Sequence, residues 1–138
     1  MQKRMIFKEL LLSEIDIVIT EMSKTQSLDE KIYFFSAVHS TAQRIMNLDF
    51  SNDLLYMHSI LQYAYQSFFS RLQAIKAGET TIPFTEEQVD RLDYLLRDLV
   101  DCLTEGKSVD AVMKEFVKLA YSTTGNGYYL MKKGALKL

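Results

Sequence analysis

The residues whose types and spacing most readily suggest chemistry lie in an acidic segment, from residue 79 to residue 105. Its eight carboxylates stand against two arginines, which gives a local charge of −6. Glu87 and Asp90 are three residues apart, and so are Asp98 and Asp101. On a helix this spacing brings two side chains onto one face, where paired carboxylates can bind Mg²⁺ in a hydrolase. A metal-dependent hydrolase that uses these four carboxylates is therefore one hypothesis for the function.

The same carboxylates have a simpler interpretation. A hydrolase of this kind needs a second carboxylate-bearing helix opposite the first, and residues 28–77 offer almost no acids at inward positions. Charged residues along one side of a helix usually face solvent. We therefore favour a solvated acidic face, and we predict neither a bound metal nor another cofactor.

The two histidines and the single cysteine give little support for catalysis. His39 and His58 could meet across two neighbouring helices, but neither has a glutamate three residues before it, so the Glu-x-x-His pattern of di-iron bundles is absent. Cys102 follows Asp101, and acidic neighbours disfavour the thiolate that a nucleophilic cysteine requires. We expect core or boundary histidines and a structural cysteine, and we predict no catalytic residue.

The charge reverses in the C-terminal segment, where six lysines from residue 106 onward oppose two acids for a local charge of +4. Small residues that leave backbone amides accessible are followed there by tyrosines, a combination that can bind phosphate groups and stack on bases. The residues of this ligand-binding or nucleic-acid-binding hypothesis are Lys114, Lys118, Gly125, Asn126, Gly127, Tyr128, Tyr129, Lys132 and Lys133. The alternative is a turn whose glycines reverse the chain, followed by tyrosines that dock the tail on the rest of the protein. The net charge of −2 disfavours a general nucleic-acid binder without excluding a local basic patch.

The elements that must position these residues are helices. Apolar residues recur at steps of three and four in five segments, and the single proline and all five glycines fall outside them. Ser27 and Glu30 form one capping-box pattern, and Thr85 and Gln88 form another. Ser108 is the predicted N-cap of the last helix. We predict helices over about residues 3–22, 28–47, 53–77, 86–105 and 109–120.

Short connections between these helices predict an all-α, up-and-down bundle of about five helices, in which each helix packs against the next. Residues 1–122 form the helical domain. Residues 123–138 form a C-terminal tail, either a short helix or an extended arm, packed on the same domain. A chain of 138 residues is long enough to bury one hydrophobic core.

The composition indicates a cytoplasmic protein without a membrane contact. Its one cysteine cannot form an intramolecular disulfide, which argues for a reducing compartment. The acids Glu9, Glu14 and Asp16 interrupt the first apolar run too early for a signal peptide. No apolar run approaches the ~20 residues that a membrane span requires.

The predicted central helix, residues 53–77, has no Lys, Arg, Asp or Glu between Leu54 and Ser70. Its apolar face is wider than one packing contact needs. We assign an additional row of its residues to a subunit interface, namely Tyr56, Ile60, Tyr63 and Gln66. Because aromatic residues are enriched at protein interfaces, we predict a homo-oligomer, with a dimer favoured over larger assemblies.

The function that these observations favour is self-association and protein–protein interaction without catalysis. In this interpretation the acidic segment and the basic C-terminal segment orient or select the partner, which is a second copy or another protein. Binding of a nucleic acid or a phosphate ligand through the C-terminal residues is the alternative. The metal-dependent hydrolase is the third hypothesis.

Overall fold

A computed structural model describes the backbone of residues 2–138 and the side chains from Lys8 onward. Within residues 2–138 there are six helices and no strand. The helices are α1 (Gln2–Ser23), α2 (Leu28–Leu48), α3 (Asn52–Lys76), α4 (Glu86–Glu105), α5 (Asp110–Ser122) and α6 (Gly125–Lys132). The prediction of an all-helical fold is confirmed, and the C-terminal segment adds a sixth helix to the five that we predicted.

Local hydrogen bonds set most of the helix ends. The hydroxyl of Ser27 caps α2 and that of Ser51 caps α3, each by accepting a backbone N–H three residues further along. At α4 both bonds of the predicted capping box form: the Thr85 hydroxyl accepts the N–H of Gln88 at 3.1 Å, and the Gln88 side chain accepts the N–H of Thr85 at 2.8 Å. Gly106, with a φ of 70°, ends α4 in the left-handed conformation that glycine tolerates best.

The start of α5 differs from the prediction by one residue. Val109, not Ser108, is the N-cap residue, and its side chain makes no capping bond. The Ser108 hydroxyl instead accepts the N–H of Asp110, the first residue of α5, at 3.2 Å. Because Val109 packs against the hydrophobic core, a tertiary contact that capping preferences do not consider holds this residue at the helix start.

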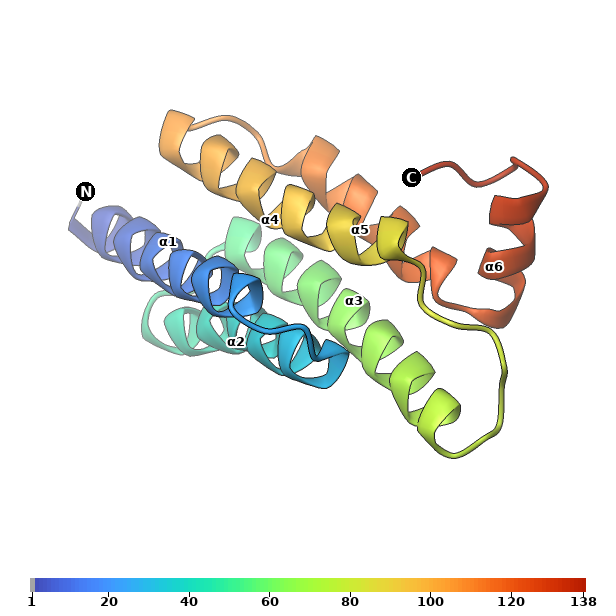
Figure 1. Cartoon of the computed structure of the whole chain (residues 1–138). Helices are drawn as coiled ribbons and strands as arrows, with labels where there is room; N and C mark the ends of the chain where they lie inside the picture. The colour runs from blue at the N-terminus through green and yellow to red at the C-terminus, as the bar shows by residue number, and fades with distance from the viewer. Residues whose placement is uncertain (1) are drawn as a thin grey trace.

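Helices α1 to α5 alternate in direction along the bundle, as predicted (Figure 1). However, neighbours in space are not always neighbours in sequence, because α3 packs against α2 and α5 while α4 packs against α1 and α5. In the described chain α3 and α4 do not pack on each other, so the prediction that each helix contacts the next is wrong here. The connection of residues 77–85 is long enough for α4 to return beside α1, and α5 then fills the space next to both α3 and α4.

The core lies where α2, α3 and α5 meet. Each contributes one buried phenylalanine, and the ring centroid of Phe35 is 6.3 Å from that of Phe68 and 6.1 Å from that of Phe116. Apolar faces of α1 and α4 complete the core, whereas α6 packs against α5 alone (Figure 1). Near the end of the chain, Leu138 returns to pack against this core. None of the described helices combines the length and the apolar character needed to cross a lipid bilayer.

Candidate anion-binding groove

A shallow, open groove lies between α3 and the turn that joins α5 to α6, and we call it the Arg71 groove. It has a volume of about 460 Å³. Its α3 wall consists of Tyr63, Gln66, Ser67, Ser70, Arg71 and Ala74. Across from them lie Thr80, from the α3–α4 connection, and Thr123, Thr124 and Gly125, from the α5–α6 turn. The α3 residues recur at steps of three and four, so they form one continuous stripe along the helix.

Three consecutive residues, the last of α5 and the two of the α5–α6 turn, each bond to a different helix. The Gln88 side-chain amide of α4 donates to the Ser122 carbonyl at 3.2 Å and to the Ser122 hydroxyl at 3.0 Å. From α3, Nε of Arg71 donates to the Thr123 carbonyl at 2.8 Å. The Thr124 hydroxyl caps α6 by accepting a backbone N–H at 3.0 Å. These contacts hold the backbone of the turn in place as one wall of the groove.

Gly127 has a packing role in this turn. A Cβ atom at this position would lie 1.9 Å from the carbonyl oxygen of Tyr121 and 2.9 Å from the Cα of Ser122, which are both backbone atoms. Only glycine therefore lets α6 cross so closely over the end of α5. At Gly125, by contrast, an added Cβ would meet nothing within 4 Å.

Arg71 is the unusual residue of the groove, because it is a permanently charged side chain with only 8% of its surface exposed. Its Nε bonds the Thr123 carbonyl, and its Nη1 donates to the Ile82 carbonyl at 3.4 Å. Both acceptors are uncharged. Among the described residues, no Asp or Glu carboxylate lies within ion-pair distance of Arg71. Buried charges in proteins are normally paired with an opposite charge, so this guanidinium lacks its usual counter-ion.

The N-terminus of α6 lies at the same end of the groove as Arg71. The backbone amides of Gly125 and Asn126 make no hydrogen bond to the described part of the chain. The first amides of a helix and its positive dipole end favour anions, and a guanidinium adds a full positive charge. The Arg71 guanidinium and the first turn of α6 together are suited to bind one anionic group.

The structure divides the residues that we predicted for ligand or nucleic-acid binding. On α6, Gly125 lines the groove and Asn126 follows it, whereas Tyr128 is partly buried with Nζ of Lys132 5.1 Å from its ring centroid. Tyr129 is exposed, with its ring centroid 5.4 Å from that of Tyr128.

The remaining predicted lysines are not part of the groove lining. Lys133 is exposed at the end of α6 and Lys114 is exposed on α5. Lys118, also on α5, forms an ion pair with Glu115 at 3.2 Å. The nine predicted residues therefore do not form one continuous binding surface.

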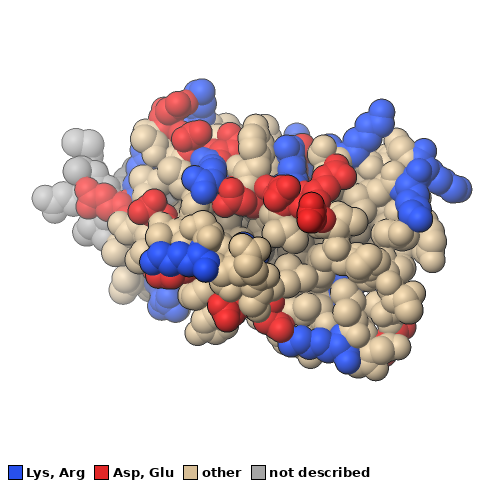
Figure 2. All heavy atoms as spheres, in the orientation of Figure 1, with Lys and Arg blue, Asp and Glu red and all other residues tan. Residues whose placement is uncertain are grey.

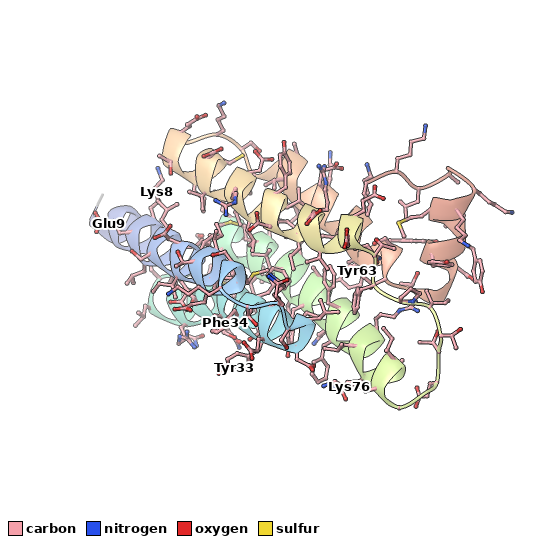
Figure 3. The ribbon with its side chains drawn as sticks, in the orientation of Figure 1. Lys8, Glu9, Tyr33, Phe34, Tyr63 and Lys76 are labelled. Atoms are coloured by element: carbon pink, nitrogen blue, oxygen red, sulfur yellow. The ribbon has the colours of Figure 1, made fainter. Side chains whose placement is uncertain are left out.

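The predicted interface residues also lie in two different environments. Tyr56 and Ile60 are partly buried against the core of their own chain. Tyr63 and Gln66 line the Arg71 groove, where Tyr63 is 42% exposed (Figure 3). Two residues that we selected for a protein interface thus line the same groove as the glycine that we selected for a phosphate ligand.

Arg71 is not among the residues that we predicted for a functional site. The signal was nevertheless present, because the buried positions Leu61, Ala64 and Phe68 lead to Arg71 at the next helical step. An arginine that continues the buried face of an amphipathic helix needs polar partners in the folded protein. Arg71 could therefore have been predicted as a candidate site residue from its charge and its position on the buried face of the helix.

A second polar cluster joins α2 to α3, and we call it the His39 cluster. His39 and His58 do meet across these helices, with ring centroids 5.9 Å apart, and the Tyr65 ring centroid lies 5.2 Å from that of His39. Nδ1 of His58 is hydrogen-bonded to the His39 carbonyl oxygen at 3.1 Å. Both ring nitrogens of His39 are buried without a partner among the described residues. Burial and, secondly, the charge of His58 lower the pKa of His39 below its ordinary value of 6.5.

The carboxylates and the cysteine that we considered for catalysis are not assembled into a site. Among the described residues, no three or more His, Cys, Asp or Glu side chains are grouped where they could hold a metal ion. Cys102 lies near the other end of the bundle, at a cavity of about 690 Å³ that it lines with Lys8 and Lys107. Burial and the nearby Asp98 carboxylate raise the pKa of the Cys102 thiol, which disfavours the nucleophilic thiolate.

Comparison of the chain with models of known protein families found no match, and comparisons with curated proteins and with solved structures found none either.

Proposed function

We propose that this chain binds a small anionic ligand in the Arg71 groove, and that a phosphate group is the anion that fits best. The observation that carries this proposal is the buried Arg71 guanidinium, which has no carboxylate partner among the described residues and lies beside the first turn of α6. A tetrahedral phosphate can accept from the guanidinium and from helix amides at the same time. Such a ligand would supply the negative charge that the described residues do not provide.

The lining of the groove supports binding rather than turnover. Its described residues include no His, Cys, Asp or Glu, which are the usual general bases and nucleophiles. They include instead the hydroxyl groups of Ser67, Ser70 and Thr80, which can hydrogen-bond a polar ligand. An acid-free lining also avoids electrostatic repulsion of an anion.

Calorimetric titration with inorganic phosphate tests the proposal, using a matched pair of variants at Gly125. Proline is tolerated at the first position of a helix, and the φ of −76° and ψ of 164° at Thr124 suit a residue that precedes proline. Gly125→Pro removes one of the amides without disturbing this backbone, whereas Gly125→Ala retains it. We expect Gly125→Pro to weaken phosphate binding by about twentyfold, within the range for one hydrogen bond to a charged group, and Gly125→Ala to leave it unchanged.

The same titration on Arg71→Met removes the positive charge. We expect no measurable phosphate binding by this variant, with circular dichroism as the check that it is still folded. Failure of the wild-type chain to bind phosphate, or equal binding by Gly125→Pro and Gly125→Ala, would contradict the proposed site.

A second candidate function is self-association, in which the acidic face of α4 contacts the α6 end of a second copy. Figure 2 shows acidic groups along the part of the surface that carries α4, and basic groups at the end that carries α6. Within the described residues, the α4 carboxylates of Glu87, Asp90, Asp98 and Asp101 form no ion pair, and neither do Lys132 and Lys133. Charge complementarity of this kind orients two partners that approach each other.

Native mass spectrometry at low and high ionic strength tests self-association. We expect a dimer whose population falls as salt is added, because exposed charges are screened over about 10 Å at 0.1 M salt. The variant Lys133→Glu should reduce the dimer, while Lys114→Glu on α5 serves as a control of equal charge change. A chain that is monomeric at every salt concentration, or a dimer that ignores both salt and charge reversal, would rule out this contact.

A further inference from the structure

We infer that the ligand of the Arg71 groove is a nucleoside monophosphate, with its phosphate at Arg71 and the first turn of α6 and its base against Tyr63. This inference rests on the anion binding proposed above. It is suggested by the order in which different chemical groups follow one another along the α3 wall.

The length of the stripe fits a phosphate, a sugar and a base in sequence. Tyr63 and Arg71 are separated by eight residues, which is about 12 Å along a helix at 1.5 Å per residue. Ser67 and Ser70 lie between them on the same wall. The groove thus changes from an aromatic ring, through hydroxyl groups, to a buried cation over the length of one nucleotide.

The Tyr63 end has the groups that would hold a base. The Tyr63 ring is 42% exposed and packs on no other aromatic ring of the described chain. An exposed ring face can stack on any base. One helical turn further along, the exposed Gln66 side chain carries both a donor and an acceptor, which is the combination that the edge of a base presents.

The middle of the groove suits a sugar. The hydroxyl groups of Ser67 and Ser70 make no hydrogen bond to the described residues. Each can therefore donate to and accept from a ribose hydroxyl. Neither serine is needed to hold the fold of the groove in place.

The charge of the groove selects one phosphate group rather than several. Arg71 is the only charged residue that lines it among the described residues, and the α6 amides add the equivalent of about half a positive charge. This matches a single phosphate monoester. A diphosphate or triphosphate would place additional negative charge where the lining offers no further cation.

Titration with inorganic phosphate, ribose 5-phosphate, adenosine monophosphate and uridine monophosphate tests this inference. We expect each nucleoside monophosphate to bind about tenfold more tightly than ribose 5-phosphate, because only the nucleotides have a base to stack on Tyr63. Tyr63→Ala should reduce nucleotide affinity to that of ribose 5-phosphate without changing ribose 5-phosphate binding. Tyr63→Phe should retain nucleotide affinity, since it keeps the ring.

Tyr33→Ala is the matched control, because Tyr33 is an exposed tyrosine on α2 that does not line the groove (Figure 3). We expect it to bind both ligand classes as the wild type does. Equal affinity for ribose 5-phosphate and the nucleotides would overturn this inference while leaving anion binding intact. Tighter binding of a 5′-phosphorylated oligonucleotide than of any mononucleotide would also overturn it. Absence of phosphate binding would overturn both proposals.

Discussion

The Arg71 groove and the His39 cluster both involve helix α3, but their buried side-chain nitrogen atoms differ in hydrogen bonding. Arg71 donates to two backbone carbonyls, those of Thr123 and Ile82. His39 has two buried ring nitrogens and no partner for either among the described residues. A buried cation therefore keeps hydrogen bonds at one site, while a histidine at the other site is held in its neutral form.

The difference follows from what each side chain faces. Thr123 lies just after the last residue of α5, and Ile82 lies in a connection, so their carbonyls have no helical partner and are open to a donor. His39 lies in the middle of α2 and faces His58 and Tyr65 of α3, where the backbone N–H groups are bonded within the helices. The carbonyl of His39 is also hydrogen-bonded to Nδ1 of His58, but no backbone group is a partner of the His39 ring among the described residues. Helix ends thus offer partners for a buried polar side chain, and helix centres offer few.

The close approach of Gly127 to the backbone of Tyr121 predicts the largest change in the free energy of unfolding. Gly127→Ala forces the added Cβ against the Tyr121 carbonyl, so the α5–α6 turn must open. We expect it to lower the free energy of unfolding by about 3 kcal/mol, at the upper end of the range for overpacked sites. Chemical denaturation measures this difference. Gly125→Ala, two residues earlier and without steric conflict, should change stability by less than about 0.5 kcal/mol, and similar losses for both variants would contradict the assigned role.

Removal of the guanidinium tests directly whether the hydrogen bonds of Arg71 stabilise the protein. Arg71→Met keeps much of the buried side-chain volume but leaves the carbonyls of Thr123 and Ile82 without their donor. We expect a loss of about 2 kcal/mol in the free energy of unfolding, measured by denaturation in the absence of ligand. An unchanged stability would show that Arg71 does not hold the turn in place.

The His39 cluster predicts a dependence of stability on pH. Because the pKa of His39 is lowered in the folded state, the unfolded chain binds a proton first as the pH falls through 6.5. The stabilising contribution of neutral His39 is thus complete above this value and is lost as the pH decreases toward the lowered folded-state pKa. Denaturation between about pH 7 and about pH 5 should show this decline in the wild type.

The variant His39→Phe separates this histidine from the other titrating groups. It removes both unpartnered nitrogens, while the His58 bond to the backbone carbonyl of residue 39 can remain. We expect a shallower fall in stability with acidification and a gain of about 1 kcal/mol at neutral pH. An identical pH dependence in the variant and the wild type would assign the decline to other residues.

The smallest effect is expected for an exposed arginine, which is a useful comparison with Arg71. Nε of Arg97 donates to the Asp93 carboxylate at 2.9 Å, one helical turn away on the solvent-facing side of α4. We expect Arg97→Met to cost less than about 0.5 kcal/mol in a denaturation experiment, because water solvates and screens both charges. A loss as large as that of Arg71→Met would show that burial does not determine the difference between the two arginines.

Much of the fold could be predicted from local patterns. Thr85 and Gln88 form the predicted capping box, and Ser27 caps α2, although its own N–H bonds the Thr25 hydroxyl and not the Glu30 side chain. The apolar spacing of each helix identified most of its buried face. These features depend on residues that are three or four positions apart. The incorrect prediction at Ser108 arose where a long-range contact, the packing of Val109 on the core, determined a helix start.

The candidate groove could be predicted only in parts. Gly125 was selected for anion binding, and Tyr63 and Gln66 were selected for a different purpose, a subunit interface. No local pattern joins these residues, because α3 was expected to pack against α4 and instead packs against α5. Arg71 was missed for a related reason, since its importance depends on a carbonyl group that lies 52 residues further along the chain.

By itself, the sequence determined where most helices begin and end and which faces they bury, because capping bonds and helical periodicity act over one or two turns. Tertiary packing alone places α5 beside α3, joins the last residue of α5 and the two turn residues after it to three different helices, and buries Arg71 among uncharged partners. The physical reason is that helix neighbours are chosen by the simultaneous burial of all the apolar faces and by the reach of the connections. No single segment of the chain contains that information.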